Sequence, residues 1–300
     1  MPLRRSFSPS SFLSLARSIL PSATSKPVHT LSANIAMRVP RNTAGLATKY
    51  EINADMGEGF GRWKMGPDEE LMPLLDAANI ACGFHAGDPS IMLRTVRLCK
   101  QHNVRAGAHP GLPDLLGFGR RRFDIAPADI YSLVLYQVGA LQAMLAAEGM
   151  PLSHIKPHGE LFFVMQRDAA ILRAVLDACV HFPGVPVYGS AGAVEEAALC
   201  DEMDLAFQGE LYVDIDYSAE GTLVPPAKSQ VATPELCGKR AHDAMLEDKG
   251  LNQDGVTFSF GFGENPFSIC MHSDMPTVLD NTLAVRKAVD EMNKKRGWRK

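Results

Sequence analysis

Polar side chains that can do acid–base chemistry follow one expected strand after another along this sequence. In chain order they are Asn53 and Asp55, His85 and Asp88, His109, Lys156 and His158, and His272 and Asp274. Imidazoles and carboxylates serve as general bases or metal ligands, and a lysine ammonium can polarise a carbonyl group. If the strands lie parallel, their carboxyl ends converge on one face and bring these groups together. The pattern therefore predicts one catalytic site for acid–base chemistry.

The stretch from Asn79 to Asp88 is the centre of this pattern. A short apolar run is typical of a buried strand, and Gly83 and Gly87 then bracket a tight turn that contains His85. Asp88 precedes Pro89, as at the start of many helices. We expect a strand, a polar turn and a helix.

Each candidate also has a structural interpretation. Asp55 could bond only to a turn, Asp88 could only cap a helix, and His109 and His158 could be loop residues. Four other histidines lie on expected helices or outside the strand-end pattern and are expected to be structural, namely His102, His154, His181 and His242. Cys270 is expected in the core, with a nucleophilic thiol near His272 as the alternative.

Expected strands and helices alternate. The strands are residues 50–53, 80–82, 104–108, 154–159 with its turn, 185–189, 205–213, 256–260 and 269–271. The helices are residues 68–78, 89–101, 127–148, 168–181, 193–199, 234–247 and 277–294. Seven or eight such units favour an α/β fold with a closed, TIM-like (β/α)7–8 barrel over a doubly wound sheet. The sequence has neither a dinucleotide-binding G-x-G-x-x-G after the first strand nor a P-loop.

Residues 1–46 differ from the rest, and we expect a single barrel domain over residues 47–300. The first 46 residues contain six Lys or Arg and no acid, which leaves 24 basic and 34 acidic residues in the remainder. This composition is typical of a mitochondrial transit peptide, and the alternatives are a disordered tail or a true start at Met37. The expected location is therefore mitochondrial, with the cytoplasm as the alternative. The acidic remainder argues against nucleic acid as a partner, and the lack of a long apolar run argues against a membrane span. The six cysteines are expected to be reduced.

Five motifs in this sequence resemble those of the LamB/YcsF lactam-utilization family, which includes the A subunit of 5-oxoprolinase. They are Asn53–Gly59, Ala78–Asp88, Gly107–Pro110, Lys156–Gly159 and Cys270–Asp274. The resemblance covers about residues 48–293, in the family's order. It implies a barrel of the glycoside hydrolase/deacetylase type.

The resemblance also implies a component of ATP-dependent lactam hydrolysis, which opens 5-oxoproline or a lactam such as 2-pyrrolidinone. ATP would be bound or used with partner subunits, and dependence on a divalent metal is left open. The catalytic candidates are Asp55, His85, His109, Lys156 and His158, with Asp55 or His158 as base and Lys156 with His85 as electrophilic donors. The candidates for substrate binding are Asn53, Asp88, Asp214, His272 and Asp274.

Three departures from the family pattern bear on the substrate. Ile215 and Pro226 stand where the family commonly carries arginines, and Phe162 replaces a usual tyrosine. Arginine is the natural partner of a carboxylate, so we expect a lactam without one. The alternative functions are a stand-alone metal-dependent deacetylase or carbohydrate hydrolase on the same barrel, and a non-catalytic scaffold subunit.

Overall fold

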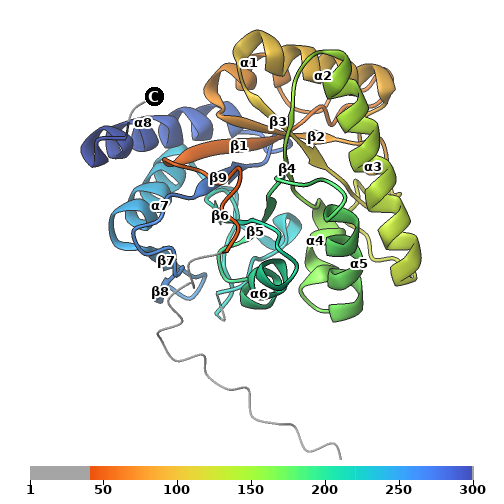
Figure 1. The fold of residues 1–300 in the computed structure, drawn as a ribbon. Helices are drawn as coiled ribbons and strands as arrows, with labels where there is room; N and C mark the ends of the chain where they lie inside the picture. The colour runs from red at the N-terminus through yellow and green to blue at the C-terminus, as the bar shows by residue number, and fades with distance from the viewer. Residues whose placement is uncertain (1–40, 220, 299–300) are drawn as a thin grey trace, which may run out of the picture. The chain divides into compact units, whose positions relative to one another are not determined.

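Seven parallel strands form a closed barrel in this computed structural model, which describes residues 41–219 and 221–298 (Figure 1). The strands are β1 (Glu51–Met56), β2 (Ala77–Ala81), β3 (Arg105–His109), β4 (Leu152–Ile155), β5 (Val187–Ser190), β6 (Phe207–Tyr212) and β9 (Ser268–Met271). Each pairs in parallel with its neighbour, and β9 closes the barrel between β6 and β1. The predicted TIM-like barrel is confirmed, with seven strands.

Helices surround the barrel and connect its strands (Figure 1). They are α1 (Asp68–Leu71), the 3-10 helix η1 (Met72–Leu74), α2 (Pro89–His102), α3 (Pro127–Ala147), α4 (Gly159–Met165), α5 (Ala169–Cys179), α6 (Val194–Glu202), the 3-10 helix η2 (Pro226–Lys228), α7 (Pro234–Glu247) and α8 (Val278–Arg296). Several begin where the sequence places a cap followed by proline. The Thr233 hydroxyl, for example, accepts the backbone N–H of Leu236 at the start of α7.

The helix predicted over residues 68–78 is wrong beyond its first turn. Only Asp68–Leu71 is α-helical, and η1 follows before β2 begins at Ala77. Pro73 lies within η1, where its ring and missing N–H prevent an α-helix from continuing. The predicted strand–turn 154–159 is also shifted, because β4 ends at Ile155 and the short helix α4, which was not expected, begins at Gly159.

The strand predicted over residues 256–260 exists but is not part of the barrel. It is β8 (Thr257–Ser259), which pairs antiparallel with β7 (Lys249–Leu251) in a separate two-stranded sheet. Its exposed and half-buried side chains contrast with the fully buried run of β9. Residues 1–46 are predicted to form a tail or targeting segment, and residues 1–40 of it lie outside the described residues. The targeting role therefore stays a prediction.

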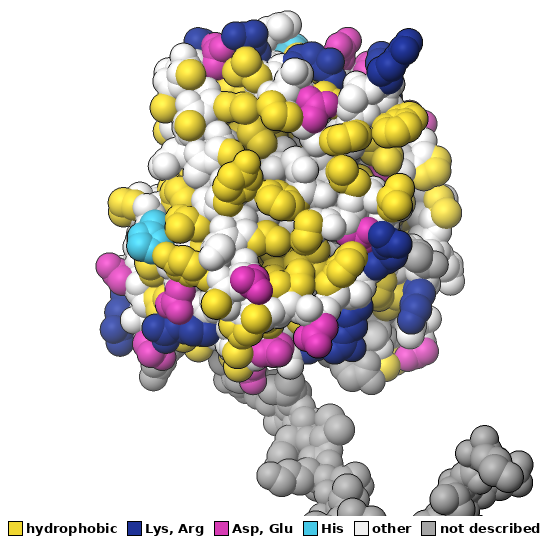
Figure 2. Space-filling view, turned by 90° about the vertical axis from the view of Figure 1, so that its right-hand side faces the viewer, with side chains coloured by type: hydrophobic (Ala, Val, Ile, Leu, Met, Phe, Trp, Pro, Cys, Tyr) yellow, Lys and Arg dark blue, Asp and Glu magenta, His cyan; other side chains and the backbone are white. Residues whose placement is uncertain are grey.

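Helix α3 is long and apolar enough to span a membrane by length and composition alone. In the structure it packs on the barrel through side chains such as Ile130, Val134 and Leu141, beside α5. Figure 2 looks at the right-hand side of Figure 1, where α3 lies, and shows apolar side chains spread over this face with charged ones toward its upper and lower ends. Tyr136 of α3 is one of the exposed apolar residues.

The barrel interior is polar beneath its open end. The Asn53 amide donates to Glu210 Oε1 at 2.6 Å and to Ser268 Oγ at 2.7 Å. Asn79 donates to Asn53 Oδ1 at 2.7 Å, and His154 Nε2 lies 2.6 Å from Asn79 Oδ1. These residues are fully or almost fully buried. This satisfied network forms a rigid polar layer that supports the side chains at the strand ends.

Candidate active site

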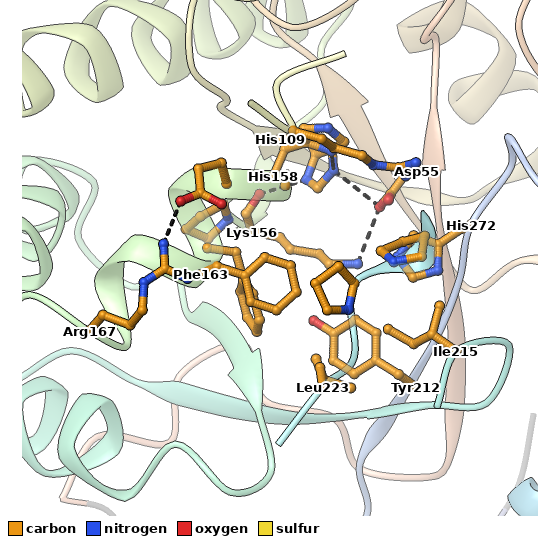
Figure 3. A pocket seen from close by; sticks show the side chains of 17 residues that line it. Asp55, His109, Lys156, His158, Phe163, Arg167, Tyr212, Ile215, Leu223 and His272 are labelled. Atoms are coloured by element: carbon orange, nitrogen blue, oxygen red, sulfur yellow. Dashed lines mark hydrogen bonds and ion pairs between the residues drawn. The ribbon is translucent and has the colours of Figure 1, made fainter. Parts of the chain in front are cut away.

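A cavity of about 180 Å³ opens at the carboxyl ends of the barrel strands (Figure 3). Five residues from the sequence-predicted site line it: Asp55, His109, Lys156, His158 and His272. They come from β1, β3, β4 and β9 or the residues just after them, so the convergence expected of a parallel barrel brings them together.

Lys156 and Asp55 form a buried ion pair at the base of this cavity. Lys156 Nζ lies 3.2 Å from Asp55 Oδ1 and 3.8 Å from Glu210 Oε2. Burial alone would lower the pKa of Lys156, but the charges of Asp55 and Glu210 outweigh it and hold this pKa well above its usual value. Lys156 is therefore a fixed cation that can donate to an oxyanion.

Asp55 is held as an anion by the same surroundings. Burial would raise the pKa of its carboxyl, but the charges of His109, Lys156 and His272 hold it well below its usual value. Asn79 also donates to Asp55 Oδ1 at 2.8 Å. A carboxylate with this many donors is a better partner for Lys156 than a base for water.

The thiol of Cys270 contacts the same lysine. Lys156 Nζ lies 2.7 Å from Cys270 Sγ. Burial first, and then the nearby carboxylates, raise the pKa of this thiol well above its usual value, although Lys156 opposes the shift. A protonated thiol is a poor nucleophile, so the alternative role of Cys270 as nucleophile gains no support.

A second group of side chains lies beside this network and consists of Glu58, His85, His109 and His158. Their ligand atoms all lie within 4.8 Å of one another, and all four residues are buried. The rings of His85 and His158 stack at 3.8 Å between centroids, and His85 Nε2 lies 3.4 Å from Glu58 Oε1. We call these four residues the histidine cluster. Their donor set, three imidazoles and a carboxylate, could hold a divalent metal ion.

Burial also shapes the charge of this cluster. Burial first, then neighbouring histidines, hold the pKa of His85 and of His158 well below the usual value, so both rings are neutral. Burial and the charge of Asp55 raise the pKa of Glu58 well above its usual value. The sequence suggests His85 as an electrophilic donor, but this residue does not line the cavity, and its ring faces Glu58 and His158 instead.

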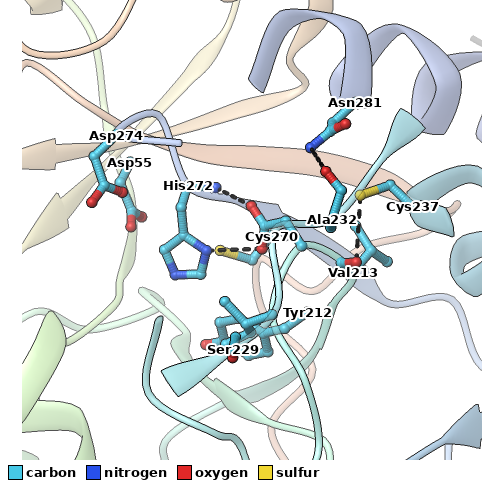
Figure 4. A network of polar contacts seen from close by, with 12 residues as sticks. Asp55, Tyr212, Val213, Ser229, Ala232, Cys237, Cys270, His272, Asp274 and Asn281 are labelled. Atoms are coloured by element: carbon cyan, nitrogen blue, oxygen red, sulfur yellow. Dashed lines mark hydrogen bonds and ion pairs between the residues drawn. The ribbon is translucent and has the colours of Figure 1, made fainter. Parts of the chain in front are cut away.

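His272, labelled in Figure 4, forms a hydrogen-bonded pair with Asp214. His272 Nδ1 lies 2.9 Å from Asp214 Oδ1, and the backbone N–H of His272 donates to Asp214 Oδ2 at 2.7 Å. Burial lowers the pKa of His272, but the charge and hydrogen bond of Asp214 outweigh it, so this pKa lies above its usual value. Asp214 fixes Nδ1 as the donor and leaves Nε2 for the cavity that His272 lines.

Besides Asp214, which pairs with His272, three residues predicted to bind substrate do not line the cavity. Asp88 caps α2, where its carboxylate accepts the backbone N–H groups of Ser90, Ile91 and Gly61. Asn53 lies one layer below the cavity. The carboxylate of Asp274 is paired with the guanidinium of Arg120, whose Nη1 donates to Asp274 Oδ2 at 2.7 Å. The geometry thus supports the helix-cap interpretation of Asp88 and supporting positions for the other two.

The outer wall of the cavity is apolar. It is formed by Phe162, Phe163, Ile215, Leu223, Pro225 and Pro226. Both arginines among the described residues that line the cavity are already paired, Arg120 with Asp274 and Arg167 with Glu160. This wall suits an uncharged, partly apolar ligand better than an anionic ligand.

Comparisons with known proteins agree with this architecture. Residues 50–297 match the LamB/YcsF family. The chain belongs to the LamB/YcsF family. It is 44% identical over 256 residues to the lactam utilization protein lamB of Emericella nidulans, a match that covers 85% of this chain and all of that protein. It is 40% identical over 248 residues to the 5-oxoprolinase A subunit of Pyrococcus abyssi, covering 81% of this chain and 94% of that protein.

A solved structure shows the same fold within the LamB/YcsF family. The crystal structure of a lactam utilization protein from Thermus thermophilus superposes with a TM-score of 0.73 at 40% identity. The match covers 81% of this chain and 96% of that chain. The expected membership of the LamB/YcsF family is thereby confirmed.

Both positions at which the sequence departs from the LamB/YcsF arginine pattern are in the cavity wall. Ile215 and Pro226 line the cavity together with Phe162, the third departure. All three side chains therefore face the space in which a ligand would bind. Ile215 and Pro226 make the wall apolar at the two positions where the resemblance leads us to expect arginines.

Sequence reasoning missed some residues of the site. Glu58 lies within the Asn53–Gly59 motif but is given no role among the residues predicted from sequence. It follows β1 by two residues, much as the other candidates follow their strands. Tyr212 lines the cavity, and its hydroxyl donates to Glu210 Oε2 at 3.0 Å. His154 was expected to be structural, and its place in the buried layer agrees with that. The strand-end rule, applied to every polar residue, would have found Glu58.

Proposed function

We propose that this protein catalyses the hydrolytic opening of a small, uncharged lactam as one component of an ATP-dependent system. The observation that carries the proposal is the cavity itself, where a fixed lysine cation and an Asp–His pair face an apolar wall. Relatives at 40–44% identity are named as a lactam utilization protein and as the A subunit of 5-oxoprolinase, which supports the choice of a cyclic amide as substrate.

In this proposal Lys156 stabilises the negative charge that develops on the lactam oxygen. Hydrolysis adds a water oxygen to the carbonyl carbon and then breaks the C–N bond, so charge accumulates on the oxygen in between. A buried ammonium held in place by Asp55 meets this charge without reorganisation. Asp55 thus positions Lys156 rather than accepting the proton from water.

His272 is the base that the geometry supports best. Its Nδ1 is oriented by Asp214, as in other pairs of base and orienting carboxylate, and Nε2 is left to accept a proton from water. The ring nitrogen of the lactam takes up a proton as the C–N bond breaks. His158, one of the predicted bases, has Nε2 bonded to the Phe118 carbonyl and Nδ1 turned toward His109.

ATP chemistry is assigned to partner subunits. The sequence has no P-loop, and the arginines of the cavity are engaged by carboxylates rather than free to hold phosphates. An amide is a poor electrophile, so phosphorylation of the lactam oxygen by a partner would lower the barrier to attack. Addition of water and cleavage of the C–N bond would then give an acyl phosphate, which a second water hydrolyses to the carboxylate and inorganic phosphate. A metal ion in the histidine cluster, when bound, would polarise a carbonyl or a water.

A second candidate is a metal-dependent deacetylase that works without ATP, because the histidine cluster offers the ligands for it. One assay separates the two. The full chain is mixed with 2-pyrrolidinone, 5-oxoproline or an N-acetylated sugar, with and without ATP and the other subunits of a 5-oxoprolinase, and products are quantified by mass spectrometry. We expect 2-pyrrolidinone to be opened only in the complete mixture.

The matched variants are His272→Gln and His242→Gln, since His242 lies on the exposed face of α7. We expect His272→Gln to lower turnover by about 100-fold and His242→Gln to leave it unchanged. Release of acetate without ATP would replace the proposal with the deacetylase. Lactam opening that is equal in both variants would refute the assignment of His272.

A further inference from the structure

The histidine cluster contains buried polar atoms that nothing in the described part of the chain satisfies. Neither ring nitrogen of His85 has a hydrogen-bond partner among the described residues, and the same holds for Glu58 Oε1. The side chains of His85 and Glu58 are 0% and 1% exposed. An unsatisfied buried polar group costs about 1–3 kcal/mol, so a folded protein rarely keeps several together unless another group occupies the site.

The hydrogen bonds on the outer side of the cluster fix its tautomers. His109 Nδ1 lies 2.7 Å from the Lys156 carbonyl oxygen, and His158 Nε2 lies 2.8 Å from the Phe118 carbonyl oxygen. A carbonyl only accepts, so each of these nitrogens carries the proton. This arrangement leaves His158 Nδ1 to accept a hydrogen bond or bind a cation, and His109 Nε2 also lies 3.3 Å from Asp55 Oδ1.

His109 Nε2 and His158 Nδ1 face each other at 2.9 Å. A shared proton or a metal ion can hold two ring nitrogens at this distance. Metal-binding histidines characteristically donate the other ring nitrogen to a backbone carbonyl, which fixes the ring and directs its lone pair at the ion. His109 and His158 both have this arrangement, and the ligand atoms of His85 and Glu58 lie close to theirs.

We propose that Glu58, His85, His109 and His158 bind one divalent transition-metal ion, with zinc as the preferred ion. The inference deepens the proposed function because His109 and His158 also line the cavity, but its test does not require lactam turnover. Imidazole and carboxylate ligands favour zinc or another late first-row ion, whereas magnesium and calcium prefer all-oxygen sites.

A second group of candidate ligands is less suited to an ion. Asp55, Cys270 and His272 also have ligand atoms within 4.8 Å of one another. Each of them already has a charged partner, since Lys156 contacts Asp55 and Cys270, and Asp214 pairs with His272. A cation placed there would lie against the Lys156 ammonium, so repulsion favours the histidine cluster.

The test measures bound metal in the full chain. The purified protein is stripped with a chelator, loaded with zinc, dialysed and analysed by plasma mass spectrometry, and cobalt loading adds a visible absorption spectrum. We expect about one zinc per chain, a cobalt spectrum with nitrogen ligands, and thermal stabilisation by zinc but not by magnesium. The variants are Glu58→Gln and His85→Asn, which change ligand character with little change in volume.

Each ligand variant should weaken zinc binding by more than about 10-fold, while His102→Gln on α2 keeps wild-type affinity. Circular dichroism shows which variants are folded. A folded wild type that holds less than about a tenth of an equivalent of zinc would overturn the proposal. So would zinc that survives both ligand variants but is lost in Cys270→Ser, because the ion would then belong to the second group.

Discussion

Two neighbouring regions at the mouth of the barrel use buried polar residues in opposite ways. Around Lys156, nearly every donor has an acceptor, through Asp55, Asn53 and Glu210. In the histidine cluster, His85 and Glu58 keep atoms without a partner among the described residues. The satisfied region has its charges fixed before substrate arrives, whereas the ligand set of the cluster is complete only with an added ion. Fixed charges and a proposed metal-ligand set thus lie next to each other at the carboxyl ends of the strands.

The largest effect is expected where the satisfied region loses its cation. Lys156→Met should lower lactam turnover by about 100- to 1,000-fold, because the oxyanion loses its donor. It should also destabilise the fold by about 3–5 kcal/mol, since Asp55 and Glu210 are left buried without their cation. Turnover and urea unfolding check both effects. Lys239→Met, at an exposed pair on α7, is the control, and a fully active Lys156→Met would remove the lysine from the mechanism.

A second, smaller loss is expected when the base loses its orienting partner. Asp214→Asn should lower turnover by about 10- to 100-fold. Because Asp214 raises the pKa of His272, its loss should lower that pKa and move the acidic limb of the pH–rate profile to lower pH. The profile of Asp243→Asn on α7 is expected to match the wild type. An unshifted limb in Asp214→Asn would mean that His272 does not accept the proton.

The apolar wall gives a change of selectivity rather than a loss. Ile215→Arg and Pro226→Arg each place a guanidinium in the cavity wall, where it can pair with a substrate carboxylate. The ratio of kcat/KM for 5-oxoproline to that for 2-pyrrolidinone should rise by about 10-fold. Val194→Arg, at an exposed position of α6, should leave it unchanged. A wild type that already prefers 5-oxoproline would contradict the role given to this wall.

The smallest effect is expected for a buried carboxylate of α6 that belongs to neither region. Glu196 of α6 is fully buried, and burial first, then the charge of Glu210, raises its pKa to about 8. The folded state keeps this proton while the unfolded state releases it, so the free energy of unfolding should fall as pH rises from about 4.5 to about 8. Glu196→Gln should flatten this slope in thermal unfolding, whereas exposed Glu195→Gln should not. An unchanged slope would show that Glu196 ionises normally.

Much of the barrel could be predicted from sequence because strand and helix patterns alternate regularly. The errors have local causes. Residues 68–78 have helical spacing of apolar residues, but Pro73 stops the helix, and the strand at 256–260 pairs with β7 because β9 occupies the barrel position. Sequence alone also gives no sign of which apolar strand closes a barrel.

The site was predictable to the extent that strand ends converge. Asp55, Lys156 and His272 meet as expected, but depth along a strand is not visible in the sequence. Asn53 points inward like Asp55 yet lies one layer lower, where it contacts Ser268. The partner of each histidine depends on neighbouring strands, which is why the Asp214–His272 pair emerges only in three dimensions.

The most direct test of the contrast between the two regions measures zinc content and lactam turnover on one preparation of folded Lys156→Met. The substitution removes the ammonium but keeps the main-chain carbonyl that holds His109 Nδ1. We predict that this variant retains about one zinc per chain but loses lactam turnover, so that the two properties respond independently. Loss of the zinc together with turnover, or full turnover with the lysine gone, would contradict this account.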